Sequence, residues 1–183
     1  MKKFIPVNEP LIVKQDISSI KKTLEEGWVS AEGPNVKIFE NKFSKFIGHK
    51  YAVTVANGTA ALEIAVQSLN LPKNSEVITP GLNFGTAVSS IILSNLKPIF
   101  VDIDKETLQI DTRLIKKKIT RKTKALLIPN LVGNVPNWQE IKKIAKKYNL
   151  KIIEDSADTL GAKIGLKPTG SFSDISITSF YGS

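Results

Sequence analysis

The chain has 183 residues, of which 42% are hydrophobic, and it carries a formal net charge of +9. These totals favour a globular domain with a sizeable core over a disordered chain. Because the chain has no cysteine and one histidine, His49, disulfides and thiolate or histidine-rich metal sites are excluded, and no metal is expected.

The positive charge raises the question of nucleic acid as a partner. The lysines are scattered and only Arg113 and Arg121 are arginines, whereas base readout and bidentate phosphate contacts favour arginine. The basic run at 116–124 is interpreted as a solvated helix end and loop. There is no secretory signal and no apolar run of about 18 residues. We therefore expect a cytoplasmic protein that binds neither nucleic acid nor membranes.

Apolar residues at helical spacing predict two helices near the N-terminus, over 14–26 and 35–47. Gly48 follows the second helix as a predicted C-cap. His49 comes next and is expected in a surface turn. Segment 1–50 is therefore interpreted as a helical arm that carries a loop between its two helices.

From residue 51 onward, short apolar runs alternate with helical patterns. Strands are predicted at 51–56, 76–80, 98–104, 124–130, 150–156 and 174–180. Helices are predicted between them at 58–69, 83–95, 111–119 and 136–148. This alternation predicts an α/β fold of three layers, in which a mostly parallel sheet lies between helices and residues 51–183 form the core.

Ligands of such sheets lie beyond the carboxyl ends of the strands. After the first predicted strand, Asn57 and Gly58 form a turn, and Thr59 and Ala60 open the next helix. Free N–H groups at a helix start, with a glycine and a hydroxyl beside them, are typical of a phosphate site. The same residues also fit an ordinary turn with an N-cap. Neither a P-loop nor a G-x-G-x-x-G fingerprint occurs.

Three further residues lie at strand ends. Phe84 is either a core residue or a platform for a flat ring. Asp155 needs a cation or several donors, since an isolated buried carboxylate is costly. The hydroxyl of Ser179 could add to a phosphate site. Together these features describe a flat, phosphorylated ligand with a basic ring nitrogen, and pyridoxal 5′-phosphate (PLP) fits that description.

Five stretches, in the order GWVSAEGPNVKIFENKF, VANGTAALEIAVQSL, EVITPGLNFGTA, KPIFVDIDKETLQID and IIEDSADTLGAKIGLKPTGSFSDISITSF, give the chain a specific resemblance. It resembles the DegT/DnrJ/EryC1/StrS family of PLP-dependent sugar aminotransferases over nearly its whole length. The resemblance implies the large domain of a fold type I PLP enzyme, truncated before the small C-terminal domain.

By this resemblance, the cofactor is PLP or pyridoxamine 5′-phosphate (PMP), and seven residues bind it. Gly58, Thr59, Ala60 and Ser179 hold the phosphate, Phe84 packs on the ring, Asp155 pairs with the pyridine nitrogen, and Asp158 faces the ring near its hydroxyl. The family usually has glutamine in place of Asp158, and an aspartate there is more similar to the branch that removes the 3-hydroxyl of a 4-keto-6-deoxy sugar nucleotide.

The resemblance also implies residues that contact substrate or a partner subunit. Trp28 and Ser30 lie in a loop, 27–34, that reaches toward bound ligand in a homodimer, although Trp28 could instead pack on its own helix. Asn130 stands where the family often has a histidine. The Schiff-base lysine position falls just after Ser183, so no catalytic residue is expected within the chain.

The expected function is that of the N-terminal part of an aminotransferase that acts on a nucleotide-linked keto sugar in sugar or cell-surface polysaccharide biosynthesis, with an amino donor such as glutamate. One alternative is PLP- or PMP-dependent 3-dehydration of such a sugar. Another is a truncated fragment that binds without catalysis. Lysine or histidine after Ser183 would separate the first two, and residues 1–183 alone are expected to be inactive.

Overall fold

The computed structural model describes residue 5, residues 9–30 and residues 32–180. Its main sheet has five parallel strands in the order β2-β1-β3-β4-β7. The strands are β1 (Glu76–Pro80), β2 (Lys97–Val101), β3 (Thr123–Pro129), β4 (Lys151–Asp155) and β7 (Ile175–Ile177). β1, β3 and β4 lie inside the sheet and are almost wholly buried, as near-continuous apolar runs predict for parallel strands.

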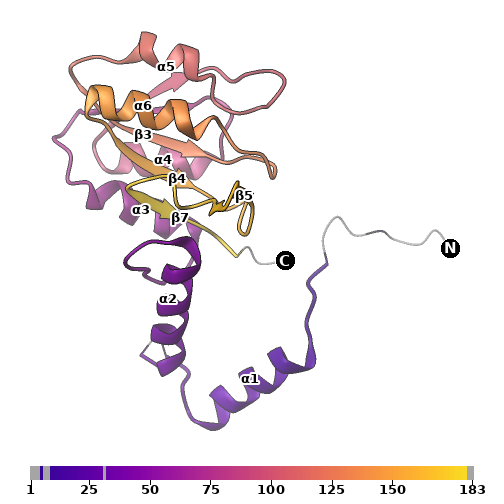
Figure 1. Ribbon diagram of the computed structural model, residues 1–183. Helices are drawn as coiled ribbons and strands as arrows, with labels where there is room; N and C mark the ends of the chain where they lie inside the picture. Colours follow the sequence, from indigo (N-terminus) through magenta and orange to yellow (C-terminus); the bar gives the residue numbers. More distant parts are fainter. Residues whose placement is uncertain (1–4, 6–8, 31, 181–183) are drawn as a thin grey trace.

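Helices cover both faces of this sheet (Figure 1). On one face, α3 (Gly58–Ser68) and α4 (Gly85–Leu93) pack on side chains such as Val77 and Ile153. On the other face, α5 (Thr112–Lys118) and α6 (Trp138–Tyr148) pack on Ile78, Leu126 and their neighbours. The side chains of adjacent strand residues thus point to opposite faces of the sheet. The predicted three-layer α/β fold is confirmed.

The N-terminal helices stand away from the layered core (Figure 1). α1 (Lys14–Glu25) buries none of its residues. α2 (Pro34–Ile47) reaches the core near its C-terminal end, where Ser44 and Ile47 are buried, and it ends at Gly48 with a φ of 83°. Gly48 therefore forms the predicted C-cap.

His49 does not lie freely at the surface. It is half-buried, and its Nε2 is 2.7 Å from the carbonyl oxygen of Gly170. The expected surface turn is therefore wrong in this respect, because His49 bonds to a loop far along the chain that its own sequence neighbourhood does not reveal.

The strand predicted at 51–56 is also wrong. The segment pairs with no strand in the described part of the chain. Thr54 gives its backbone N–H to Glu40 Oε1 at 2.8 Å and its hydroxyl to the same oxygen at 2.9 Å. Tyr51 and Val53 are 73% and 78% exposed. The β-branched pattern is present, but a strand needs a neighbour to complete its hydrogen bonds.

Between β4 and β7 the chain makes a small antiparallel hairpin that the sequence pattern did not predict. Its strands are β5 (Lys163–Ile164) and β6 (Lys167–Pro168). β7 itself is shorter than the predicted strand 174–180. The chain from 178 to 180 leaves the sheet, and Phe180 packs against Phe39 and Phe43 of α2. No helix among the described residues is long and apolar enough to cross a membrane.

Candidate cofactor site

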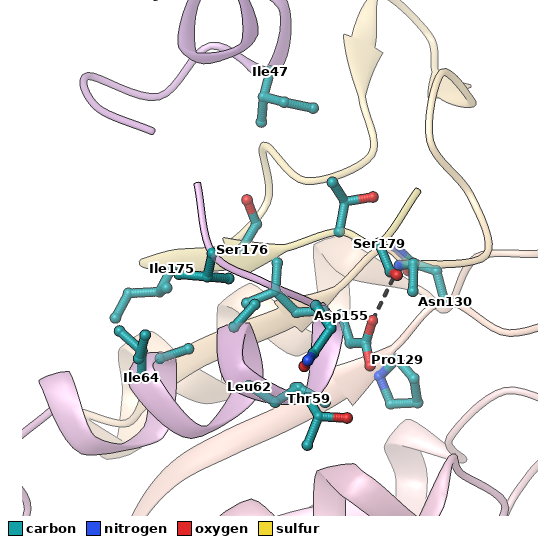
Figure 2. Close-up of a pocket in the computed structure, with 18 of the residues that line it drawn as sticks. Ile47, Thr59, Leu62, Ile64, Pro129, Asn130, Asp155, Ile175, Ser176 and Ser179 are labelled. Atoms are coloured by element: carbon teal, nitrogen blue, oxygen red, sulfur yellow. Dashed lines mark hydrogen bonds between the residues drawn. The ribbon is translucent and has the colours of Figure 1, made fainter. Parts of the chain in front are cut away.

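A cavity of about 1490 Å³ opens at the carboxyl ends of β3 and β4 and extends along β7. Of the predicted site residues, the cavity is lined by Gly58, Thr59, Phe84, Asn130, Asp155, Asp158 and Ser179. Figure 2 shows Asp155, Thr59 and Ser179 near one another, while Ile47, Ile64 and Ile175 lie around the apolar part. The strand ends thus bring together residues from distant parts of the chain, as the topology predicts.

The start of α3 meets the end of the sheet at Gly58 and Ser179. A β-carbon on Gly58 would lie 3.0 Å from Ser179 Cβ and 3.3 Å from its Oγ. Glycine therefore allows this close approach without a shift of Ser179, and the approach places the Ser179 hydroxyl beside the first turn of the helix. The positive end of a helix and a nearby hydroxyl form an environment suited to a phosphate group.

Ala60 differs from its neighbours at this helix start. Its backbone N–H donates to the side chain of Asn57 at 2.9 Å, and Asn57 is the N-cap of α3. The N-cap that the sequence allows is thus present here, and Gly58 and Thr59 of the same turn line the cavity. An anion that used the Ala60 N–H would have to displace the Asn57 cap.

Asp155 ends β4 and is 6% exposed. The pKa of its carboxyl is raised to about 6. Burial is the main cause and the nearby charges of Asp158 and Glu154 add to it, while a hydrogen bond from the Ala157 backbone N–H at 3.0 Å acts in the opposite direction. A buried carboxylate of this kind is strongly stabilised when a cation binds beside it. The site therefore favours a ligand with a positively charged group at this point.

Asp158 and Phe84 lie on more open parts of the wall. Asp158 is exposed, and its Oδ2 accepts a hydrogen bond from the Val132 backbone N–H at 3.3 Å. Phe84 is the N-cap residue of α4 and is 66% exposed. Because it is so exposed, Phe84 is not a core residue, which was one of its two predicted roles. Its ring is accessible to a flat ligand.

Asn130 lines the cavity, yet its amide group is bonded inside the protein. The side chain is 1% exposed. Its Oδ1 accepts from Trp138 Nε1 at 3.1 Å, and its Nδ2 donates to Glu154 Oε1 at 3.0 Å and to Ser156 Oγ at 3.1 Å. These bonds saturate the amide, so it has little left to offer a substrate. The sequence pattern predicts no role for Glu154 and does not reveal this cluster, although Glu154 and Asp155 are adjacent acids at a strand end.

Trp28 and Ser30 are not brought to this cavity. Both are exposed in the loop between α1 and α2, and Trp28 packs beside Gly33. Ser30 Oγ accepts from the backbone N–H of Glu32 at 3.4 Å. Their predicted contact with a substrate or a second subunit stays a prediction.

The residues present fit a ligand that carries an anion and a cation on a flat body. The anion can meet the start of α3, where Gly58 and Thr59 line the cavity, the cation has Asp155, and Phe84 offers a ring face. Among the described residues, no group of three or more acidic or histidine side chains is arranged to hold a metal ion. The fold and the cavity thus define an α/β protein whose site suits a phosphorylated heterocycle.

Comparison with known proteins gives the family. Residues 10–183 match the DegT/DnrJ/EryC1/StrS aminotransferase family, and the chain belongs to that family. It is 39% identical over 180 residues to the GDP-perosamine synthase of Escherichia coli O157:H7, an alignment that covers 98% of this chain and 50% of that protein. The chain spans about half the length of the curated relatives it matches.

Solved structures show the same fold. A mutant GDP-4-keto-6-deoxymannose-3-dehydratase with bound GDP-perosamine matches with a TM-score of 0.92 and 31% identity, over 96% of this chain and 47% of that one. The PLP form of Spr1654 from Streptococcus pneumoniae matches with a TM-score of 0.89 and 29% identity, over 97% of this chain and 49% of that one. Spr1654 has also been solved with PMP. The fold is therefore that of the N-terminal portion of a fold type I PLP enzyme.

Proposed function

We propose that the chain is the PLP-binding N-terminal part of an aminotransferase that acts on a nucleotide-linked keto sugar, in sugar or cell-surface polysaccharide biosynthesis. The observation that carries the proposal is that one cavity is lined both by the buried Asp155 and by Gly58 and Ser179, which approach each other closely. Membership of the family and the 39% identity to a GDP-perosamine synthase support it. Glutamate is the proposed amino donor.

Each residue has a defined task in this proposal. Thr59 and Ser179 donate their hydroxyls to the cofactor phosphate at the start of α3. Phe84 covers one face of the ring. Asp155 keeps a proton at the ring nitrogen, because its carboxylate is stabilised by the positive charge that the proton creates. When bound, PLP supplies an electron sink for chemistry at the substrate carbon.

A 3-dehydratase is the second candidate. Asp158 favours it, because an aspartate at this position resembles that branch of the family, and a dehydratase is among the matching solved structures. In this chain Asp158 lies three residues beyond Asp155, at the cavity wall and open to solvent. An exposed carboxylate there could hold or accept a proton near the ring, which a glutamine could not do.

The experiment is a titration of the whole protein with PLP, in which binding is monitored by the absorption band of PLP. The unaltered protein and Asp155→Ala are compared. The charge-assisted bond is worth roughly 1.5–3 kcal/mol, so affinity should fall at least about tenfold. Glu25→Ala is the control, because Glu25 is an exposed acid on α1 that lines no part of the cavity. Equal affinity of Asp155→Ala and the unaltered protein would refute the assignment.

Two further parts of the proposal concern the whole protein, and a third concerns residues 1–183 alone. It is a homodimer in which the loop with Trp28 and Ser30 reaches a neighbouring site, and it works in the cytoplasm. Residues 1–183 alone bind PLP weakly and without turnover. Borohydride treatment with PLP should then give scattered lysine adducts, whereas one stoichiometric adduct together with turnover of a keto sugar nucleotide would contradict this.

A further inference from the structure

Glu154 is a buried carboxylate to which the proposed chemistry assigns no task. Its side chain is 0% exposed. On β4 it precedes Asp155, so the two side chains point to opposite faces of the sheet. Asp155 faces the cavity, while Glu154 bonds to the Phe172 backbone and to the side chain of Asn130. A charge in such a place is tolerated only if its oxygens are bonded.

Four donors bind the Glu154 carboxylate. Oε1 accepts from the Gly170 backbone N–H at 2.6 Å, from Asn130 Nδ2 at 3.0 Å and from Ser156 Oγ at 3.1 Å. Oε2 accepts from the Phe172 backbone N–H at 2.9 Å. Two of the donors are main-chain groups, and such bonds to a charged acceptor are among the stronger ones in proteins.

These donors come from three separate segments of the chain, and one of them, Asn130, lines the cavity. Asn130 follows β3, Ser156 follows β4, and Gly170 and Phe172 lie in the loop between β6 and β7. Asn130 also donates its backbone N–H to the backbone oxygen of Asp155 at 2.9 Å. The side chain of Asn130 is thus tied to Glu154 and its backbone to Asp155.

The loop that Glu154 holds has its own link to the cavity wall. Gly170 adopts a φ of +90°, and a β-carbon there would lie 3.1 Å from Ile47 Cγ2. Its carbonyl oxygen also lies 2.7 Å from His49 Nε2. Both His49 and Ile47 line the cavity. Glu154 therefore bonds directly to residues that follow two strands, and it is linked through one loop to the end of α2 and to His49.

We propose that Glu154 is a positioning residue, whose four hydrogen bonds hold the ends of β3 and β4 and the β6–β7 loop so that Asp155 is presented, desolvated, to the cavity. The inference rests on the proposed function for the task of Asp155, but the bonds of Glu154 do not depend on a cofactor. It can therefore be tested on the protein without PLP, and a failure of PLP binding would leave the test valid.

The first measurement is the pH titration of the Asp155 carboxyl in cofactor-free protein, monitored by carbon NMR. Glu154→Gln removes the charge and sets an amide against the N–H donors, so the strand end should loosen and Asp155 should become hydrated. Loss of the Glu154 charge by itself removes only the smallest of the effects that raise this pKa, whereas hydration removes the largest. The pKa should therefore fall from about 6 most of the way to the ordinary value of about 3.9, and a slight fall, which loss of the charge alone would give, would overturn the proposal. The charged and titratable groups on the other walls, Asp158, His49, Lys50, Tyr51 and Asp174, are unaltered in this variant.

Glu76→Gln is the matched control. Glu76 Oε2 accepts from the Thr120 and Thr123 hydroxyls at the opposite end of the sheet, so it is also a bonded carboxylate on a strand. Its loss should leave the Asp155 titration unchanged. An unchanged midpoint in Glu154→Gln would overturn the proposal, and so would an equal shift in both variants, because stability alone would then explain it.

A second measurement keeps the test decisive if Glu154→Gln does not fold. In the unaltered protein, the Gly170 and Phe172 amide protons should exchange with solvent slowly, on the order of 100-fold slower than that of Gly165 in the exposed hairpin. Both are bonded to a buried carboxylate, whereas the Gly165 position is open. Exchange of all three amides at similar rates would contradict the positioning role.

Discussion

Gly58 and Ser179, far apart in the sequence, approach so closely that any side chain on Gly58 would touch Ser179. A β-carbon at Gly58 would lie 3.0 Å from Ser179 Cβ, a distance at which Ser179 has to shift by a few tenths of an ångström. We therefore predict that Gly58→Ala displaces Ser179 and weakens PLP binding. Overpacking of this kind costs typically about 1–3 kcal/mol, which corresponds to an affinity loss between about fivefold and 100-fold in a PLP titration.

Gly85→Ala is the control for this change. Gly85 is the first residue of α4, as Gly58 is of α3, but a β-carbon there meets no atom within 4 Å. Its substitution should leave PLP affinity unchanged and leave stability equal or slightly higher. Equal affinities of the two alanine variants would mean that the Gly58–Ser179 approach has no bearing on the ligand.

The two hydroxyls near this approach give a second prediction. Thr59→Ala and Ser179→Ala should each weaken PLP, and the double variant should weaken it further, because each removes a hydrogen bond to a charged group. A loss of about tenfold for each change is expected. Inorganic phosphate should compete with PLP in the unaltered protein and compete less well in the double variant. Affinity that is unchanged in the double variant would place the phosphate elsewhere.

Asp155 gives a prediction about stability. Its pKa in the folded chain is raised to about 6, whereas an unfolded chain has an ordinary value near 3.9. The folded state therefore holds the proton more tightly, and the stabilisation is present below about pH 4 and is lost as pH rises through about 6. Without cofactor, Asp155→Asn should be more stable than the unaltered protein by about 2–3 kcal/mol above pH 7, with no difference below about pH 4.

Urea unfolding of both proteins across this pH range measures the effect. The added stability would come with weaker PLP binding, since the carboxylate that destabilises the free protein is the group that receives the cofactor. A stability difference that is independent of pH would show that ionisation of Asp155 is not its cause.

Trp138 and Trp28 form a matched pair for a further prediction. Trp138 is 2% exposed, donates its Nε1 to Asn130 and stacks on Phe172 with ring centroids 5.7 Å apart. Trp138→Phe keeps an aromatic ring but leaves the Asn130 oxygen without that donor, which should cost about 1–3 kcal/mol of unfolding free energy. Trp28 is 43% exposed, so Trp28→Phe should be neutral in the same denaturation experiment, and equal losses would contradict the buried-bond argument.

The sheet and its helices followed from the sequence because buried strands and amphipathic helices have local patterns. For example, the adjacent Ile152 and Ile153 predict a strand without any knowledge of the strands beside which it lies. The pattern failed where the outcome depended on distant contacts. Val53 has strand propensity, but its neighbour Thr54 gives its N–H to Glu40. Asn130 likewise bonds to Glu154, a partner that no spacing in the sequence indicates.

The most direct test of the account is a crystal structure of the whole protein with PLP. We expect the phosphate at the start of α3, within about 3 Å of the Thr59 and Ser179 hydroxyls, and the ring nitrogen within about 3 Å of a carboxylate oxygen of Asp155. A phosphate bound at another helix, or a ring nitrogen that faces away from Asp155, would contradict the proposed site.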